Sequence, residues 1–264
     1  MELYENERID EVNDKLRLIQ KPEGLTFGTD ALLLAGYIHG RYDDGIELGA
    51  GSGIISMLLL TRGKVDSVRA VEIQEEYASL TARNAELNGL SDRLAVEVLD
   101  IRDLPQKDKK CELIFTNPPY MKVGCGNANA LSKKNIARHE VHGTIRDFCH
   151  AASVHLKYGG TFAVVYRPDR LTELLSAMHA EGLEAKNMTF VHADEKSDSS
   201  MVLVLAKKGG RCGLFLSPPL LIYKDGSHGA YSEEMEYILE NGSFPSHFYK
   251  QGKRKAVRLN DGKK

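Results

Sequence analysis

Four consecutive residues near the middle of the chain could bind and activate an amino group. They are Asn117, Pro118, Pro119 and Tyr120, and they follow an apolar run, 112–116, that is typical of a β-strand. Both prolines fix φ and lack an N–H donor, so the Pro118 carbonyl and the Asn117 side chain can accept both hydrogen bonds of one planar amine. That arrangement directs the nitrogen lone pair toward an electrophile, while Tyr120 could stack on the ring that carries the amine. The alternative interpretation is a rigid Pro-Pro turn beside a surface tyrosine.

A glycine-rich turn lies where an earlier strand is expected to end. It contains Glu47, Gly49, Gly51 and Gly53 and precedes an apolar helix. Glycines let the backbone approach a ligand closely, and the N-terminus of the following helix points N–H groups at it. The G-x-G-x-G spacing differs from the G-x-G-x-x-G dinucleotide fingerprint, which makes pyrophosphate binding the weaker interpretation. A tight strand-to-helix connection without a ligand is the other alternative.

Acidic residues end the next two expected strands. Glu72 lies about 20 residues beyond the turn, where nucleotide-binding folds place an acid that accepts hydrogen bonds from ribose hydroxyls. Asp100 ends the third strand and could accept a hydrogen bond from an adenine amine. Either acid alone would be read as a solvated strand end. Because open α/β sheets bind ligands outside the carboxyl ends of their strands, the turn and the two acids together predict a cofactor that contains a nucleoside.

Short β-branched runs alternate with longer amphipathic ones, which is typical of βαβ units. Strands are expected at 44–48, 67–73, 94–99, 112–116, 161–166, 187–192 and 201–206. Helices are expected to begin at Thr29, with Thr29 or Asp30 as the cap, and to span 145–156, ended by Gly159 and Gly160. The last two strands have no helix between them. The pattern therefore predicts an α/β, Rossmann-like fold: a mostly parallel seven-stranded sheet with an antiparallel edge hairpin and helices on both faces.

The composition excludes several classes of protein. The 264 residues include 35 Lys+Arg and 37 Asp+Glu, and this net charge of −2 argues against a protein that coats nucleic acid. No run approaches the ~18 apolar residues that a membrane span needs. The four scattered cysteines form no C-x-x-C pair, which disfavours a disulfide framework and a zinc site. The acidic N-terminus resembles neither a secretory signal nor a transit peptide, so we expect a cytoplasmic protein.

Residues 27–206 resemble class I S-adenosylmethionine-dependent methyltransferases, in which Asn-Pro-Pro-Tyr is the acceptor-site signature of enzymes that methylate an exocyclic amine or amide nitrogen. Further motifs make the chain similar to the tRNA1(Val) (adenine-N6)-methyltransferase family, whose members modify the adenine beside the anticodon. These motifs are Phe27-Gly28-Thr29-Asp30-Ala31, Ala137-Arg138-His139-Glu140, Tyr166-Arg167-Pro168-Asp169-Arg170-Leu171, Pro218-Pro219-Leu220 and Tyr223-Lys224-Asp225-Gly226.

The resemblance implies a role for each residue that matches its motifs. Asn117, Pro118, Pro119 and Tyr120 would form the catalytic acceptor site. S-adenosylmethionine would be the cofactor, held by Thr29, Asp30, Glu47, Gly49, Gly51, Gly53, Glu72, Ile73, Asp100 and Ile101. The methyl group would pass directly from the sulfonium to adenine N6, with no metal and no covalent intermediate. The target base would have to be unpaired or flipped to reach a recessed pocket.

Two basic segments are candidates for RNA contacts. The stretch 122–142, interpreted as a lid on the substrate side, carries Lys122, Lys133, Lys134 and Arg138. The tail 250–264 has seven basic residues and one acid, and its candidate RNA contacts are Lys250, Lys253, Arg254 and Lys255. A tail that only adds solubility is an equally open interpretation.

The domain organisation predicted from these features has four parts: an N-terminal extension (1–26), a methyltransferase domain (27–210), a small appendage (211–249) and a basic tail (250–264). The expected partner is tRNA, without a membrane or an obligate protein partner. Two rival functions remain open. The same acceptor motif could act on another substrate, namely rRNA or DNA adenine or protein glutamine, or the chain could be a non-catalytic RNA-binding relative. The basic segments favour RNA over a protein substrate.

Overall fold

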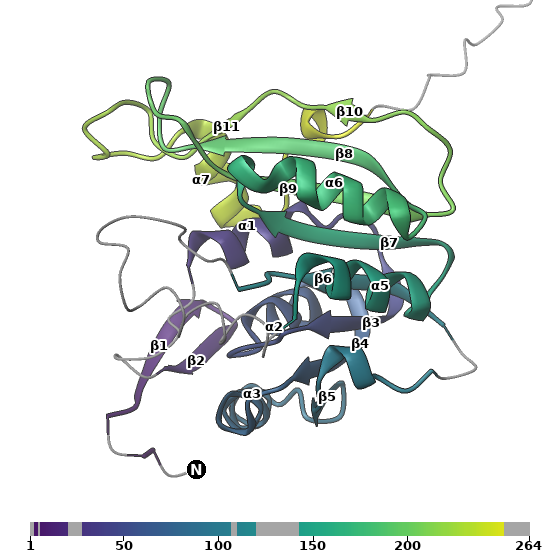
Figure 1. The fold of residues 1–264 in the computed structure, drawn as a ribbon. Coiled ribbons are helices and arrows are strands. Elements are labelled where there is room, and N and C mark those ends of the chain that lie inside the picture. The colour runs from purple at the N-terminus through teal and green to yellow at the C-terminus, as the bar shows by residue number, and fades with distance from the viewer. Residues whose placement is uncertain (1–2, 5, 21–27, 107–109, 120–142, 251–264) are drawn as a thin grey trace, which may run out of the picture.

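The computed structural model describes residues 3–4, 6–20, 28–106, 110–119 and 143–250. Its centre is a sheet with the strand order β10-β8-β9-β7-β6-β3-β4-β5, and β11 also pairs with β8 (Figure 1). The long strands of this sheet are β3 (Tyr42–Leu48), β4 (Val65–Glu72), β5 (Leu94–Val98), β6 (Cys111–Thr116), β7 (Leu156–Tyr166), β8 (Leu183–His192) and β9 (Ser199–Lys208). They confirm the seven strands expected from the sequence.

The sheet is larger than predicted because the appendage adds to it. Two short strands, β10 (Phe215–Leu216) and β11 (Leu220–Leu221), pair in parallel with β8 and give nine strands instead of seven. β9 runs antiparallel to both β7 and β8, as the predicted hairpin requires. Each remaining pair of long strands is parallel. The carboxyl ends of the central strands therefore meet along one edge.

Helices cover both faces of the sheet, as predicted. One face packs against α1 (Thr29–Tyr37), α2 (Ile54–Thr61), α3 (Glu75–Leu87) and α7 (Glu233–Asn241), and the other against α5 (Ile145–His155), α6 (Leu171–Ala180) and the short helix η1 (Ile101–Asp103). In Figure 1, α5 and α6 lie in front of the sheet, and α1, α2 and α7 lie behind it. α2 is buried almost entirely, because each side chain from Ile54 to Leu60 is at most 5% exposed. Its apolar sequence is thus explained by its place between the sheet and its neighbours.

The prediction that Gly159 and Gly160 end a helix is wrong. α5 already ends at His155, and both glycines lie inside β7, where the pairing with β6 jumps from Cys111↔Leu156 to Leu113↔Thr161. Gly159 has φ +76°, and a Cβ on Gly160 would lie 2.9 Å from the Leu156 side chain and from a backbone oxygen. The two glycines therefore form an irregularity in the strand.

The start of α1 also differs from the prediction. Its N-cap is Gly28 instead of Thr29 or Asp30. Gly28 has an extended backbone, and no side chain caps the helix with a hydrogen bond. The C-terminal end of α1 is closed by a distant residue: the buried Lys64 ammonium donates to the carbonyls of Ala35, Gly36 and Ile38 at 2.6–3.0 Å. Burial lowers the pKa of Lys64 to about 7. This contact fixes α1 against the beginning of β4.

A two-stranded hairpin that the sequence reasoning missed precedes α1. Its strands are β1 (Arg8–Asn13) and β2 (Leu16–Gln20), and among the described strands they pair only with each other. β2 is the inner strand, because Leu16, Leu18 and Ile19 are buried while β1 is largely exposed. The alternation of Leu16 and Leu18 was the available signal.

The segment after β11 packs back onto the central domain. Met235 and Ile238 of α7, with Phe244 and with Phe248 in the short helix η3 (Ser246–Phe248), belong to the same apolar core as α1 and α2. The division into four parts remains a prediction. A short helix, η2 (Pro168–Arg170), begins at Pro168 and leads into α6. No helix within the described part of the chain has the length and apolarity needed to cross a bilayer.

Candidate active site

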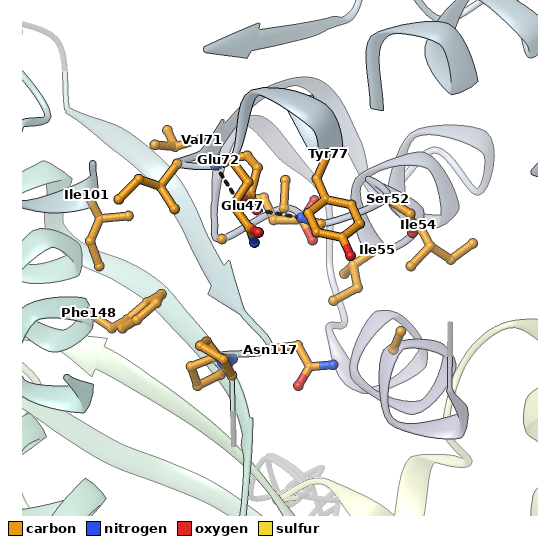
Figure 2. Close-up of a pocket in the computed structure, with 18 of the residues that line it drawn as sticks. Glu47, Ser52, Ile54, Ile55, Val71, Glu72, Tyr77, Ile101, Asn117 and Phe148 are labelled. Carbon is orange, nitrogen blue, oxygen red and sulfur yellow. Dashed lines mark hydrogen bonds between the residues drawn. The ribbon is translucent and has the colours of Figure 1, made fainter. Parts of the chain in front are cut away.

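A cavity of about 540 Å³ opens at the carboxyl ends of β3, β4 and β6. Its volume lies in the range of small-molecule and cofactor sites, about 300–1,000 Å³. Figure 2 shows Glu47, Glu72 and Tyr77 on one side of this space and Asn117 and Phe148 on the other. The lining residues are Gly28, Asp30, Ala31, Glu47, Gly49, Ala50, Gly51, Ser52, Ile54, Ile55, Val71, Glu72, Ile73, Gln74, Tyr77, Asp100, Ile101, Asn117, Pro118, Pro119 and Phe148.

The glycine-rich turn after β3 has a backbone conformation that residues other than glycine rarely adopt. Gly49, Gly51 and Gly53 have φ values of +73°, +57° and +77°. The turn is tied down on both sides: the Gly49 N–H donates to the Val71 carbonyl at 2.9 Å, and the Thr81 hydroxyl donates to the Gly51 carbonyl at 2.7 Å. This turn therefore offers a fixed backbone surface to whatever enters the cavity.

Glu72, at the end of β4, organises the same turn. One carboxylate oxygen accepts from the Gly51 N–H and the other from the Gln74 N–H, each at 2.9 Å. The residue is only 5% exposed and lines the cavity. Each carboxylate oxygen can accept more than one hydrogen bond, so these contacts are compatible with a further hydroxyl donor from a ligand. The ribose-binding role of Glu72 stays a prediction.

Glu47 is the other buried carboxyl of the cavity. It accepts from the Ser56 N–H at 3.3 Å and from the Ser56 hydroxyl, and it is 1% exposed. Burial is the largest cause of its altered ionisation and raises its pKa to about 8; the nearby Glu72 carboxylate acts in the same direction. A cationic group bound in the cavity would favour the ionised form, because an opposite charge nearby lowers the pKa of a carboxyl.

Asp100 lines the cavity but its side chain is engaged locally. Its Oδ1 accepts from the Arg102 N–H and from Arg102 Nε, both at 2.9 Å, and the two side chains form an ion pair. The neighbouring Ile101 is 7% exposed and contributes an apolar wall. The contact with an adenine amine predicted for Asp100 remains a prediction.

The acceptor motif lies on the opposite wall of the cavity. Thr116 fixes the end of β6 to the adjacent strand by donating its hydroxyl to the Leu48 carbonyl at 2.7 Å. Beyond it, Pro118 is buried and Pro119 is exposed, and Asn117 donates through Nδ2 to Asp30 Oδ2 at 2.9 Å. The fourth motif residue, Tyr120, lies outside the described residues.

The structure brings most of the predicted cofactor residues together, and two lie elsewhere. Asp30, Glu47, Gly49, Gly51, Glu72, Ile73, Asp100 and Ile101 line the cavity. Thr29 and Gly53 are not among its lining residues. Gly53 instead serves as the N-cap of α2, where a Cβ would lie 2.5 Å from Thr81 Cγ2. Its position is therefore explained by packing.

Two aromatic residues of the cavity were missed by the sequence reasoning. Tyr77 belongs to the first turn of α3, and Phe148 comes from α5, on the other face of the sheet. The phenyl ring of Phe148 lies 3.6 Å from the position of a Cβ on Gly49. Tyr77 could have been suspected because its helix starts at the carboxyl end of β4. Phe148 had no comparable signal, because only the tertiary fold brings α5 to this edge.

The predicted RNA contacts lie mostly beyond what the structure describes. Lys122, Lys133, Lys134, Arg138, Lys253, Arg254 and Lys255 all fall outside the described residues. Lys250 is described: it is exposed, and its N–H donates to Asn187 Oδ1 at 3.4 Å. Within the described ranges, no group of three or more His, Cys, Asp or Glu side chains is arranged to hold a metal ion.

The donor and acceptor set of the cavity suits a nucleoside cofactor with a cationic sulfonium. Positive-φ glycines supply a bare backbone for close approach, Glu47 and Glu72 supply acidic character, and Ile73 and Ile101 supply apolar walls. Adding a Cβ at Gly49 or Gly51 would strain the turn, because both have φ values in the left-handed region.

Comparisons with known proteins agree with this geometry. The family model for the methyltransferase small domain matches residues 24–181. A tRNA1(Val) (adenine(37)-N6)-methyltransferase from Dyadobacter fermentans is 25% identical over 201 residues, which cover 75% of this chain and 82% of the relative. A protein of the same name from Klebsiella pneumoniae strain 342 is 30% identical over 189 residues, or 70% of this chain and 76% of the relative.

Solved structures show the same fold. A crystal structure described as a predicted O-methyltransferase from Agrobacterium tumefaciens has a TM-score of 0.65 and 26% identity, over 82% of this chain and 98% of that one. A methyltransferase from Pyrococcus furiosus has a TM-score of 0.55 and 19% identity, over 74% and 90% of the two chains. Because the family model covers more than half of the chain and the relatives match most of their own length, this chain belongs to the methyltransferase small domain family and, within it, to the tRNA1(Val) (adenine-N6)-methyltransferase family.

Proposed function

We propose that this chain is an S-adenosylmethionine-dependent methyltransferase that transfers a methyl group to the exocyclic N6 of an adenine in tRNA. The observation that carries the proposal is the juxtaposition of Asn117 and Pro118 with the glycine-rich turn in one cavity. The names of its relatives from Dyadobacter fermentans and Klebsiella pneumoniae support adenine in tRNA as the substrate. On the same grounds, the target is the adenine beside the anticodon of a valine tRNA.

The residues that would hold the cofactor are those of the cavity wall formed by β3 and β4. Gly49 and Gly51 offer their backbone, Glu72 offers carboxylate oxygens to hydroxyl donors, and Ile73 and Ile101 pack against apolar parts. When bound, S-adenosylmethionine supplies an electrophilic methyl group. Glu47 also lines the cavity, and a bound cationic ligand would lower its raised pKa, so its negative charge would develop in the occupied site.

The acceptor side acts by positioning and by hydrogen bonding. The Asn117 side-chain oxygen and the Pro118 carbonyl accept the two N–H groups of the target amine, which directs the nitrogen lone pair away from the ring plane. Holding the nitrogen in line with the methyl donor converts an encounter into an oriented reaction, and such orientation can contribute about 7–11 kcal/mol. Because the cavity is recessed, the adenine enters it unstacked from its neighbours.

The wider setting follows from this substrate. We propose tRNA as the partner, without an obligate protein partner, and the cytoplasm as the location. The basic residues of 122–142 and of the tail would contact phosphates, so binding of tRNA should weaken steeply with salt. Residues 27–210 would form the methyltransferase domain and 211–249 its appendage.

The proposal is tested by incubating the protein with unmodified tRNA and labelled S-adenosylmethionine. We expect N6-methyladenosine in the tRNA, located beside the anticodon by mass spectrometry. Asn117→Ala should lower kcat by at least about 100-fold, the scale of losing one preorganised hydrogen-bonding partner in a transition state. Label in DNA or in a glutamine-containing protein but not in tRNA would identify a different substrate class, and an unchanged rate in Asn117→Ala would contradict the mechanism.

A further inference from the structure

Asp30 and Asn117 meet in the cavity although they are 87 residues apart in the sequence. Asp30 lies in the first turn of α1, and Asn117 follows β6. The Asn117 Nδ2 donates to Asp30 Oδ2 at 2.9 Å, and both residues line the cavity. In Figure 2 the Asn117 side chain projects from the strand end into the space opposite Glu47 and Tyr77.

This contact determines the orientation of the Asn117 side-chain amide, that is, which side its oxygen and its nitrogen face. A primary amide has a donor end and an acceptor end, and a 180° rotation exchanges them. A carboxylate accepts hydrogen bonds only, so it binds the Nδ2 end and rejects the Oδ1 end. If the amide rotated, its NH2 group would face the amine of the substrate, and two donors would oppose each other.

We infer that Asp30 is a positioning residue that locks the Asn117 amide in the orientation needed to accept the substrate amine. The inference rests on the proposed function for its chemical purpose, and on the observed contact for its geometry. It assigns Asp30 a role toward the acceptor side, whereas the sequence resemblance implied a role toward the cofactor. The two roles predict different behaviour, which makes them separable.

Asp30 is itself held in place. Its Oδ1 accepts from the Ala31 N–H at 2.9 Å, at the N-terminus of α1, where the helix dipole favours a negative charge. Gly28 leaves the room that this conformation needs, because a Cβ there would lie 2.6 Å from Asp30 Oδ1. The lock therefore depends on a glycine two residues earlier and on the placement of α1 by Lys64.

The inference is tested by a double-mutant cycle on kcat and on cofactor affinity. Asp30→Ala should lower kcat by about 10- to 100-fold, the scale of a small misplacement of a reacting group, with the Kd for S-adenosylmethionine changed less than about 2-fold. In an Asn117→Ala background the same change should have no further effect on kcat. Asp30→Asn can present either an oxygen or an NH2 group to Asn117, so it would tolerate both orientations of that amide and should recover little of the lost kcat.

Glu233→Ala is the matched control, since Glu233 is an exposed acid in the first turn of α7 and should leave kcat unchanged. A loss of kcat in Asp30→Ala that is equally large with and without Asn117 would overturn the inference. So would a loss of cofactor affinity that accounts for the whole effect, because Asp30 would then act on the cofactor.

A second measurement does not depend on activity. In ¹H–¹⁵N spectra, the side-chain amide pair of Asn117 is identified by its loss in Asn117→Ala. We expect one of its protons to exchange slowly in the unmodified protein and the pair to shift and exchange faster in Asp30→Ala. An unchanged pair would refute the lock even if the enzyme is active. Absence of methyl transfer by the unmodified protein, with the spectral change present, would refute the proposed function and retain the lock.

Discussion

Glu47 combines nearly complete burial with an ionisable group, and this makes the stability of the protein depend on pH. Its pKa is about 8 in the folded state and 4.5 in the reference state. Between these values the folded chain keeps a proton that the unfolded chain releases, so the free energy of unfolding falls as pH rises through this window. We expect the melting temperature of the cofactor-free protein to fall from pH 5 to pH 7 and the fall to be much smaller in Glu47→Gln, because above pH 7 the lowered pKa of Lys64 acts in the opposite direction.

The control for this prediction is Glu11→Gln, because Glu11 is exposed on β1. This variant should follow the pH dependence of the unmodified protein. If Glu47→Gln and Glu11→Gln have the same profile, Glu47 is not the group responsible. Thermal unfolding monitored by circular dichroism across the pH series provides the measurement.

Gly53 and Gly63 flank α2 and allow the steric cost of a Cβ at Gly53 to be separated from the cost of a left-handed backbone. Both have positive φ, +77° and +66°, but a Cβ would meet Thr81 Cγ2 at 2.5 Å in Gly53 and nothing within 4 Å in Gly63. Gly63→Ala should lower the free energy of unfolding by about 1–2 kcal/mol, which is the cost of placing a residue with a Cβ in the left-handed region. Gly53→Ala should cost more, because it adds a steric clash.

Urea unfolding of both variants gives the difference in free energy. Combining Gly53→Ala with Thr81→Ser provides the decisive comparison, because serine removes the clashing methyl group and keeps the hydroxyl that donates to the Gly51 carbonyl. The double variant should regain part of the lost stability. If Gly53→Ala and Gly63→Ala lower the free energy of unfolding equally, the steric contact with Thr81 does not contribute to the cost.

Residue types and spacing predicted much of the cavity, because several of its parts lie at strand ends. The glycine-rich turn, Glu72 and Asn117 each follow an apolar run in the sequence, and parallel strands carry such residues to one edge. Phe148 could not be predicted in this way, since nothing in its own helix indicates which part of the sheet it will face. The contact between Asp30 and Asn117 was equally hidden, because it joins elements 87 residues apart.

At the scale of elements, α3 holds the N-terminal hairpin with two amides placed one turn apart. Asn84 accepts from the Ile19 N–H at 2.7 Å and donates to the carbonyls of Ile19 and Ser52, and Asn88 exchanges hydrogen bonds with the backbone of Arg17. The helix thus offers β2 the pairing that a neighbouring strand would give. Through Ser52, the same amide reaches the wall of the cavity.

Asn84→Ala should destabilise the protein by at least about 2 kcal/mol, because it leaves several buried backbone groups without partners. Asn88→Ala is the matched control: it removes similar bonds at a more exposed position and should cost about 1 kcal/mol or less. Urea unfolding compares the stabilities of the two variants. Hydrogen exchange at the Ile19 amide reports directly on its hydrogen bond to Asn84. Similar losses in both variants, with unchanged exchange at Ile19, would argue against a special role for Asn84.

The elements themselves were predictable where their periodicity was strong. All seven long strands were expected, and so were the helices at Thr29, after the glycine-rich turn and at 145–156, because buried β-branched runs and amphipathic runs differ in length and period. The hairpin β1-β2 was missed because its stability comes from α3 and the core and not from its own short strands. Gly159 and Gly160 led to a wrong prediction because glycines are common both after the ends of helices and at irregularities in strands.

At the scale of the whole molecule, the net charge of −2 is an average over unlike segments. Beyond Lys250 the tail carries six basic residues and one acid. The segment just before it is fixed, because Asn187 donates to the Phe248 carbonyl at 2.8 Å and the Tyr249 hydroxyl donates to the Tyr37 carbonyl at 2.9 Å. The basic residues therefore follow a firmly anchored point on the domain.

Deleting residues 251–264 should weaken tRNA binding and reduce its dependence on salt. If three to five of the basic residues contact phosphates, the slope of log K against log salt should become shallower by about 2 to 4. The Kd for S-adenosylmethionine should not change, which provides the internal control. Measurements of tRNA binding at several salt concentrations give the slope, and an unchanged slope would favour a tail that only adds solubility.

The placement of β9 has a consequence for how the chain acquires its fold during synthesis. β8 pairs with β9, β10 and β11, and β7 with β6 and β9, so the strand made later bridges the two strands made earlier. Until Ser199–Lys208 has left the ribosome, the growing polypeptide presents the β9-facing edges of β7 and β8 unpaired, and such edges are templates for pairing with other chains. The ten residues of β9 therefore act as a late closing step, and a message cut short before them would yield an aggregation-prone fragment instead of a smaller working enzyme.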